Sequence, residues 1–150
     1  MALVAVTNSQ PRPSLLVLVG DPGHRLALIG ALRDEFRVLP DDPSRTAMKR
    51  VRDLAPELVI VAVDPRNPRG AISLCRTLKT DLRPTPVAVI DPMGAGSAEE
   101  VMETAEGYAR GQLSDERLVA WIRAVLAGRR PVEEAPLGRR SLLKRLLRRG

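Results

Sequence analysis

The sequence predicts an α/β protein with a five-stranded parallel sheet and helices on both faces. Three continuous apolar runs, at residues 14–19, 57–63 and 86–90, are typical of strands buried on both sides of a sheet. A helical apolar pattern follows each run, and strand and helix patterns alternate five times along the chain. Parallel strands need such crossovers, which are right-handed in nearly all proteins, so the pattern indicates a doubly wound sheet.

Turn residues and prolines divide the chain into these units. In the first half of the chain we predict a strand at 14–19, a turn at 20–23, a helix at 25–35, a strand at 36–39, a helix from Pro43 to Pro56 and a strand at 57–63. The second half is predicted to contain a helical pattern at 71–78, a strand at 86–90, a short helix at 97–104, a weak strand at 107–110 and a last helix whose apolar face runs from Leu118 to Leu126. Ser114 is placed to cap the last of these helices. Ligands of such sheets gather at the carboxyl ends of the strands.

Composition and charge indicate one globular domain with short extensions. Hydrophobic residues make up 44% of the chain and charged residues 28%, and no apolar run approaches the roughly 20 residues that cross a bilayer. The first six residues have no basic stretch and are too few for the core of a signal peptide, so we expect a cytoplasmic protein. The predicted parts are an N-terminal arm (1–13), the domain (14–128), a linker (129–138) and a tail (139–150).

The excess positive charge is concentrated in the tail. Of 24 Lys and Arg residues, six follow Gly138, where there is no acid, and the rest of the chain has equal numbers of bases and acids. At about 100° per residue, the leucines of the tail fall on one side of a helix and its bases on the other. These residues are Leu142, Leu143, Leu146 and Leu147, and Lys144, Arg145, Arg148 and Arg149. So short a helix is marginal by itself in water and needs a surface to fold on.

Three surfaces suit a basic amphipathic helix. An anionic membrane would accept the leucines and attract each base by about 1 kcal/mol. A groove on a partner protein would take the same leucine face. Nucleic acid gives the leucines no role, and one Trp, one Tyr and one Phe offer little base stacking, so we do not expect it as a partner. A solvated terminus and a tail folded back on its own domain remain as alternatives.

Most of the predicted domain resembles a known family, the response-regulator receiver domains of chemotaxis type, which have a flavodoxin-like fold. Residues 56–70 and the helix that follows resemble the family's third strand, its proline-containing loop and its next helix. Residues 85–90 resemble the fourth strand, and Gly107-Tyr108 with the helix at 118–126 resembles the fifth strand and the last helix. The resemblance implies a protein of two-component signal transduction or a phosphorelay.

The phosphorylation site of that family is degenerate here. The family uses an acceptor aspartate, an acidic pair that holds Mg, a hydroxyl and a lysine. In this sequence the acceptor position matches Ala62, and the acidic pair matches Gly20 and Asp21. The hydroxyl position matches Asp91, and the lysine position matches Gly111. An alanine cannot form an acyl phosphate. The resemblance therefore implies a pseudo-receiver that is not phosphorylated in the ordinary way.

An alternative uses the acids at the strand ends. Asp21, Asp64 and Asp91 each lie at the end of a predicted strand, so they could form a Mg or Ca site or supply an alternative acceptor. The chain would then be a divergent receiver or a metal-binding domain. Asp64 lies two residues after Ala62, which places it on the same face but about 7 Å further along an extended strand. The simpler interpretation is that Asp64 and Asp91, each followed by proline, begin solvent-exposed loops.

Other catalytic constellations are difficult to build from the sequence. His24, the only histidine, falls in the first turn of a predicted helix with no nucleophile placed near it, so we expect it to be solvated. Cys75 lies in an apolar helical pattern and is expected in the core. The loop at 20–23 lacks the glycine spacing and the lysine of nucleotide-binding loops. We therefore expect no enzyme and no required cofactor.

The predicted function is that of a protein-interaction module in bacterial signalling. As the resemblance implies, the recognition surface would lie between about residues 100 and 125, on the fourth helix, fifth strand and fifth helix of the family. A signalling protein is the expected partner, and the tail would add contacts with that partner or with the inner membrane.

Overall fold

The computed structural model describes residues 11–44, 46–81 and 85–136, and these residues form one doubly wound α/β unit. Its elements follow in the order β1 (Ser14–Leu18), α2 (Pro22–Leu32), β2 (Arg37–Asp41), α3 (Thr46–Leu54), β3 (Leu58–Ala62), α4 (Pro68–Asp81), β4 (Val87–Asp91), α5 (Ala98–Val101), β5 (Gly107–Arg110), α6 (Asp115–Leu126) and β6 (Val132–Glu134). The sheet has the strand order β2-β1-β3-β4-β5-β6, and every pair is parallel.

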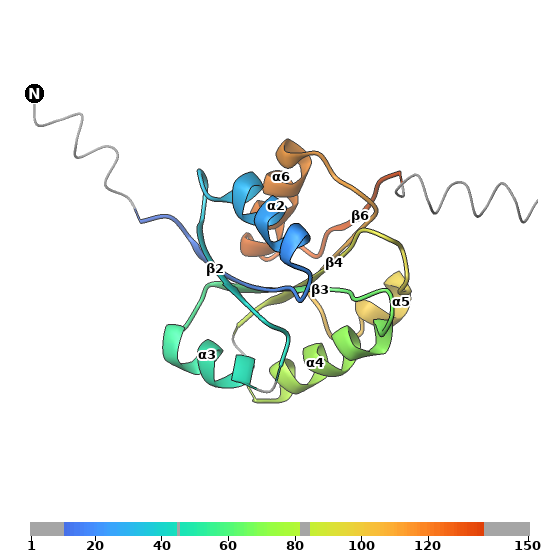
Figure 1. Ribbon diagram of the computed structural model, residues 1–150, viewed down its shortest axis with the longest axis horizontal. Helices are drawn as coiled ribbons and strands as arrows, with labels where there is room; N and C mark the ends of the chain where they lie inside the picture. The colour runs from blue at the N-terminus through green and yellow to red at the C-terminus, as the bar shows by residue number, and fades with distance from the viewer. Residues whose placement is uncertain (1–10, 45, 82–84, 137–150) are drawn as a thin grey trace, which may run out of the picture.

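The helices form one layer on each side of the sheet. Helices α2 and α6 cover one face, and α3, α4 and α5 cover the other (Figure 1). The inner strands β3 and β4 are buried at every position, as their continuous apolar runs predict. Alternate residues of β1 point to opposite faces, so Leu15 and Val17 pack in the α2–α6 layer while Leu16 and Leu18 pack in the other layer.

The predicted fold class is confirmed, and so are most of the predicted elements. Ser114 caps α6, because its hydroxyl oxygen accepts a hydrogen bond from the Arg117 N–H. Cys75 is buried in the core, where desolvation raises the pKa of its thiol to about 12. The short helix α5 spans fewer residues than the predicted 97–104.

The strand count differs from the prediction. The expected linker 129–138 contains a sixth strand, β6, which pairs in parallel with β5 and forms an edge of the sheet. Its pairing is supported at both ends, where the Tyr108 N–H donates to the Pro131 carbonyl and the Ala135 N–H donates to the Arg110 carbonyl. Most of the predicted arm and the whole tail at 139–150 lie outside the described residues.

Within the described part of the chain, no helix is both long and apolar enough to cross a bilayer.

Candidate functional site

The order of the sheet places a candidate site at the carboxyl ends of β1 and β3. Strand β1 has β2 on one side and β3 on the other, so the order of the strands reverses at β1. In doubly wound sheets, a crevice forms at the carboxyl ends of the strands where the order reverses. Ala62, the last residue of β3, lies there opposite Ile90 of β4 and is 9% exposed. Its methyl group packs in the α2–α6 core layer. The position that matches the acceptor is therefore an apolar part of the core.

Two of the three strand-end acids have local structural roles. Asp21 caps α2, and its carboxylate accepts a hydrogen bond of 2.8 Å from the His24 N–H. Asp64 is exposed and accepts a hydrogen bond of 2.9 Å from the Arg66 N–H. Both arrangements are common for aspartates that begin helices and turns. The interpretation of Asp64 as an exposed loop residue fits this structure.

Asp91 has a different role from the predicted exposed loop residue, because it is 1% exposed and fully hydrogen-bonded. Its carboxylate accepts hydrogen bonds from the Ala95 N–H at 3.0 Å, the Gly96 N–H at 2.8 Å and the Tyr108 hydroxyl at 2.5 Å. Burial, reinforced by this hydrogen bond, raises the pKa of Tyr108. Tyr108 packs in the layer opposite to that of Ala62, so Asp91 and Ala62 serve different sides of the sheet.

Gly111, which matches the lysine position, is required by the fold. Its φ is +90°, and a Cβ built on it would lie 2.1 Å from the Ala135 carbonyl oxygen. The Gln112 N–H donates to the Pro136 carbonyl at 3.1 Å, so the end of β6 passes directly over this turn. A side chain at position 111 would collide with the backbone after β6. The need for a glycine at this position cannot be read from the sequence, because it follows from the backbone after the sixth strand.

The three acids do not form a metal site with the residues that the structure describes. Among those residues, no three Asp, Glu, His or Cys side chains lie close enough to hold one ion. Asp91 has both carboxylate oxygens engaged in hydrogen bonds, and Asp21 and Asp64 each bind a backbone N–H. Mg²⁺ favours oxygen ligands that converge on one point. These side chains are instead directed into three separate turns.

A guanidinium group near this edge was not predicted from the sequence. The Arg25 side chain, on α2, donates to the Val19 carbonyl at 2.8 Å and forms an ion pair of 2.5 Å with Asp42. Val19 follows β1 and Asp42 follows β2, so a fixed positive charge joins the ends of both strands to α2. Sequence spacing placed Arg25 on a helix but gave no indication of this contact, because Asp42 is brought near only by the pairing of β1 with β2.

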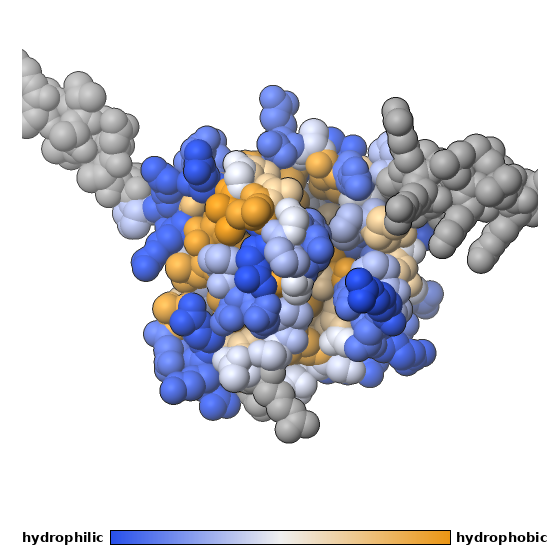
Figure 2. All heavy atoms as spheres, in the orientation of Figure 1, coloured by the Kyte–Doolittle hydropathy of each residue, from blue (hydrophilic) through white to orange (hydrophobic). Residues whose placement is uncertain are grey.

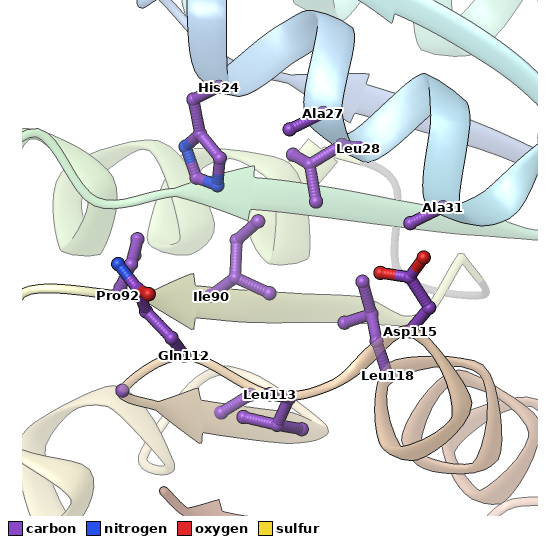
Figure 3. A pocket seen from close by; sticks show the side chains of 12 residues that line it. His24, Ala27, Leu28, Ala31, Ile90, Pro92, Gln112, Leu113, Asp115 and Leu118 are labelled. Atoms are coloured by element: carbon purple, nitrogen blue, oxygen red, sulfur yellow. The ribbon is translucent and has the colours of Figure 1, made fainter. Parts of the chain in front are cut away.

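A cavity of about 280 Å³ lies between α2 and α6, above the ends of β4 and β5. Its lining is mainly apolar and includes Leu28, Ile90 and Leu118. Figure 3 shows the His24 ring and the Gln112 amide toward one end and the Asp115 carboxylate toward the other. His24 is thus half-buried rather than solvated, and burial lowers the pKa of its ring, an effect that the Asp21 carboxylate opposes.

Among the known proteins compared with this chain, only solved structures are similar to it. No protein-family model matches the sequence. No curated protein matches it either. Solved structures do match, and response regulators are among them.

Three of these structures illustrate the likeness. A two-component response regulator of the LuxR family from Aurantimonas sp. SI85-9A1 is 22% identical, with 90% of this chain and 99% of that chain covered and a TM-score of 0.68. A response regulator from Thermotoga maritima is 21% identical, with coverages of 77% and 98% and a TM-score of 0.65. The response regulator domain of Thermotoga maritima CheB is 17% identical, with coverages of 77% and 97% and a TM-score of 0.64. The chain therefore has the fold of response-regulator receiver domains.

Proposed function

We propose that this protein is a pseudo-receiver, a phosphorylation-independent interaction module of bacterial two-component signal transduction. The observation that carries the proposal is the Ala62 methyl group, which is packed in the core at the position that matches the family's acceptor aspartate. Without a nucleophile there, phosphoryl transfer from a donor has no acceptor. The proposal assigns the chain no catalytic step and no resident metal ion, and it places the protein in the cytoplasm.

Gly111 supports the same conclusion independently of Ala62. The backbone after β6 occupies the space that a lysine side chain would need, with the Ala135 carbonyl oxygen 2.1 Å from the built Cβ. A lysine at that position would balance the charge of a bound phosphoryl group. Two of the family's functional positions therefore hold residues whose small size is used by packing.

The proposed recognition surface is held in place by hydrogen bonds rather than by a phosphoryl group. It comprises the loop after β4 together with α5, β5 and α6. Asp91 ties the loop at Ala95 and Gly96, and Arg110 donates to the Gly94 carbonyl at 3.2 Å. A surface fixed in this way needs no switch to reach its binding conformation, so binding would follow partner availability. A signalling protein is the proposed partner.

Treatment with acetyl phosphate or beryllofluoride in the presence of Mg²⁺ tests the proposal. The intact mass and the amide NMR spectrum of the full chain should remain unchanged, while a receiver that has its acceptor aspartate responds under the same conditions. Asp64→Asn is the matched variant, because Asp64 is exposed and lies two residues after Ala62. A phosphoryl group on the natural chain that is lost in Asp64→Asn would contradict the proposal.

The basic tail is proposed as a second contact, with the partner or with an anionic membrane surface. Its residues 139–150 lie outside the described part of the chain. Flotation with anionic vesicles, using the full chain and the variant with all four tail leucines changed to serine, tests the membrane contact. Equal flotation of the two proteins would argue against it.

A further inference from the structure

We propose that the basic tail, residues 139–150, docks on its own domain, with its leucines in the cavity between α2 and α6. The cavity, the apolar surface of α2, the position of the last described residue and the charges on the rim support this inference. It goes beyond the proposed function, although the cavity is bordered by α6 and by the loop after β4, which the proposed recognition surface also includes.

Helix α2 is apolar on all sides, although one side faces solvent. Only His24 and Arg25 among its residues have polar side chains. Leu26 is 70% exposed, and apolar residues gather over the outer surface of this helix in the space-filling view (Figure 2). A helix on the surface of a monomer normally presents a polar face to water. The outer surface of α2 therefore has the composition of a contact surface.

The adjacent cavity can accept apolar side chains but is small for an independent ligand. Its volume of about 280 Å³ lies at or below the roughly 300 Å³ where ligand pockets begin. Leu28, Ile90 and Leu118 line it, and so do the small side chains of Ala27 and Ala31 on α2. Side chains of leucine size that enter from a neighbouring helix would fill such a space.

The chain leaves its described part beside this cavity. The Pro136 carbonyl accepts a hydrogen bond from the Gln112 N–H, and Gln112 lines the cavity together with Gly111. Leu142 follows six residues later and Leu147 eleven residues later. At roughly 3.3 Å per extended residue, these leucines can reach about 20 to 36 Å from Pro136. The tail is therefore tethered within reach of the cavity.

Acidic side chains at the starts of α2 and α6, of which Asp115 lines the cavity, complement the bases of the tail. The three bases of α2 and α6, Arg25, Arg117 and Arg123, are all in ion pairs. Asp21, Asp115 and Glu116, which are exposed at the starts of the same helices, have no ion-pair partner among the described residues. The tail has six bases and no acid. With its leucines in the cavity, its bases would face these carboxylates.

The docked tail would stay available to other surfaces. A tethered segment binds at a high effective concentration, so a weak contact suffices to hold it. An anionic membrane or a partner groove that binds the same leucines would compete with the cavity for the tail. The cavity would thus keep the leucines covered until such a surface is present.

Paramagnetic relaxation in the full chain tests the inference. A spin label attached through Gly150→Cys reports on the far end of the tail, whereas a label near Pro136 would lie by the cavity whatever the tail did. The native Cys75 is buried with its pKa raised, so the introduced thiol reacts selectively. We expect broadening of amide signals from α2 and the start of α6, and none from α3 and α4 on the opposite face.

Three variants serve as controls for this measurement. Changing the four tail leucines to serine gives the baseline of a free tail and should reduce the local broadening at least several-fold. Ala27→Phe, which fills the cavity from α2, should do the same, whereas Gly30→Ala on the same helix should not, because its new Cβ meets nothing within 4 Å. Thermal unfolding of each variant confirms that it is folded.

Several outcomes would overturn the inference. Equal broadening with and without the tail leucines would show that the tail is free. Broadening that appears in a mixture of isotope-labelled and spin-labelled molecules would identify a second copy as the occupant. A tail that gives no local broadening and is immobilised only by anionic vesicles would identify the membrane as its sole surface. None of these results would bear on phosphorylation of the domain.

Discussion

Asp91 is the residue whose structural role departs furthest from its sequence context. A buried carboxylate is costly unless each oxygen has hydrogen-bond donors. Here two backbone N–H groups of the following loop and the Tyr108 hydroxyl supply them. The carboxylate thereby joins the end of β4 to its loop and to β5. Asp91, which the sequence predicts as an exposed loop residue, therefore acts as a structural bridge.

Substitutions at this bridge should have unequal costs. Tyr108→Phe removes one hydrogen bond to a charged group and should lower the free energy of unfolding by about 1.5–3 kcal/mol. Asp91→Ala should cost more, because it leaves two N–H groups and a buried hydroxyl without acceptors. Urea unfolding of both variants and of the double variant measures these costs and their coupling. If Asp91→Ala were the milder change, the bridge would not have the role described.

His24 should give the molecule a measurable pH dependence. Burial lowers the pKa of its ring from the ordinary 6.5, so the unfolded chain binds a proton at higher pH than the folded one. The stability contribution of the neutral ring is therefore present above pH 6.5 and is lost as pH falls from 6.5 through the lowered pKa. Urea unfolding between about pH 5 and 7.5 should show a smaller decline for His24→Gln than for the natural chain. Parallel declines would contradict this assignment.

At the scale of elements, the segment that contains β6 is the reason why position 111 must be a glycine. The backbone after β6 crosses the turn at Gly111, and the Arg117–Glu133 ion pair and the hydrogen bond from Trp121 to the Pro131 carbonyl join α6 to the same segment. Helix α6 therefore serves as the crossover between β5 and β6 as well as a cover for the sheet. The segment predicted as a linker is part of the domain.

Two glycines allow the contact with β6 to be measured separately from backbone strain. Gly111 and Gly128 have φ values of +90° and +84°, but only Gly111 has a backbone atom in the place of a Cβ. Gly128→Ala should cost about 1–2 kcal/mol, the strain of a left-handed conformation. Gly111→Ala should cost clearly more in the same urea experiment, because Ala135 must also move. Equal costs would show that the backbone after β6 does not press on this turn.

The sequence predicts the elements well where periodicity and burial agree. Strands β3 and β4 each consist of five consecutive buried residues, all of them apolar except Asp91 at the end of β4. Helix α6 has both a capping serine and a clear apolar face. Strand β6 has neither signal, because two of its three residues are glutamates and its strand state follows from pairing with β5. Its presence depends on tertiary contacts that local propensity does not contain.

The candidate site was predictable only in part. The alanine at the position that matches the family's acceptor can be read from the sequence once the strands are aligned with those of the family. The separation of Asp21, Asp64 and Asp91 could not be predicted, because backbone geometry after each strand decides which turn each carboxylate caps. The cavity beside His24 was also missed, because it arises where α2 and α6 approach each other, far apart in the sequence.

At the scale of the whole molecule, the positions that match the phosphorylation site are spread over four strands of the sheet. Gly20 follows β1, Ala62 ends β3, Asp91 ends β4 and Gly111 follows β5. Three of them have structural roles in this fold. Ala62 places a methyl group in the core, Asp91 forms a buried hydrogen-bonded bridge, and Gly111 lies in a turn that the backbone after β6 crosses. Because each is tied to a different neighbour, a substitution at any of these three positions should have a structural cost of its own.

Ala62→Asp should therefore destabilise the protein without making it a phosphorylated receiver. The new carboxylate would lie at a 9% exposed position in an apolar cluster and should lower the free energy of unfolding by about 1–3 kcal/mol or more. Ala62→Asn, which has the same shape without the charge, should cost less. Intact-mass measurement after treatment with acetyl phosphate and Mg²⁺ should detect no phosphoryl group on either variant, because Asp91 stays engaged by its loop and position 111 has no room for lysine. A phosphoryl group on the Ala62→Asp variant that is absent from Ala62→Asn would show that the acceptor was the sole missing part.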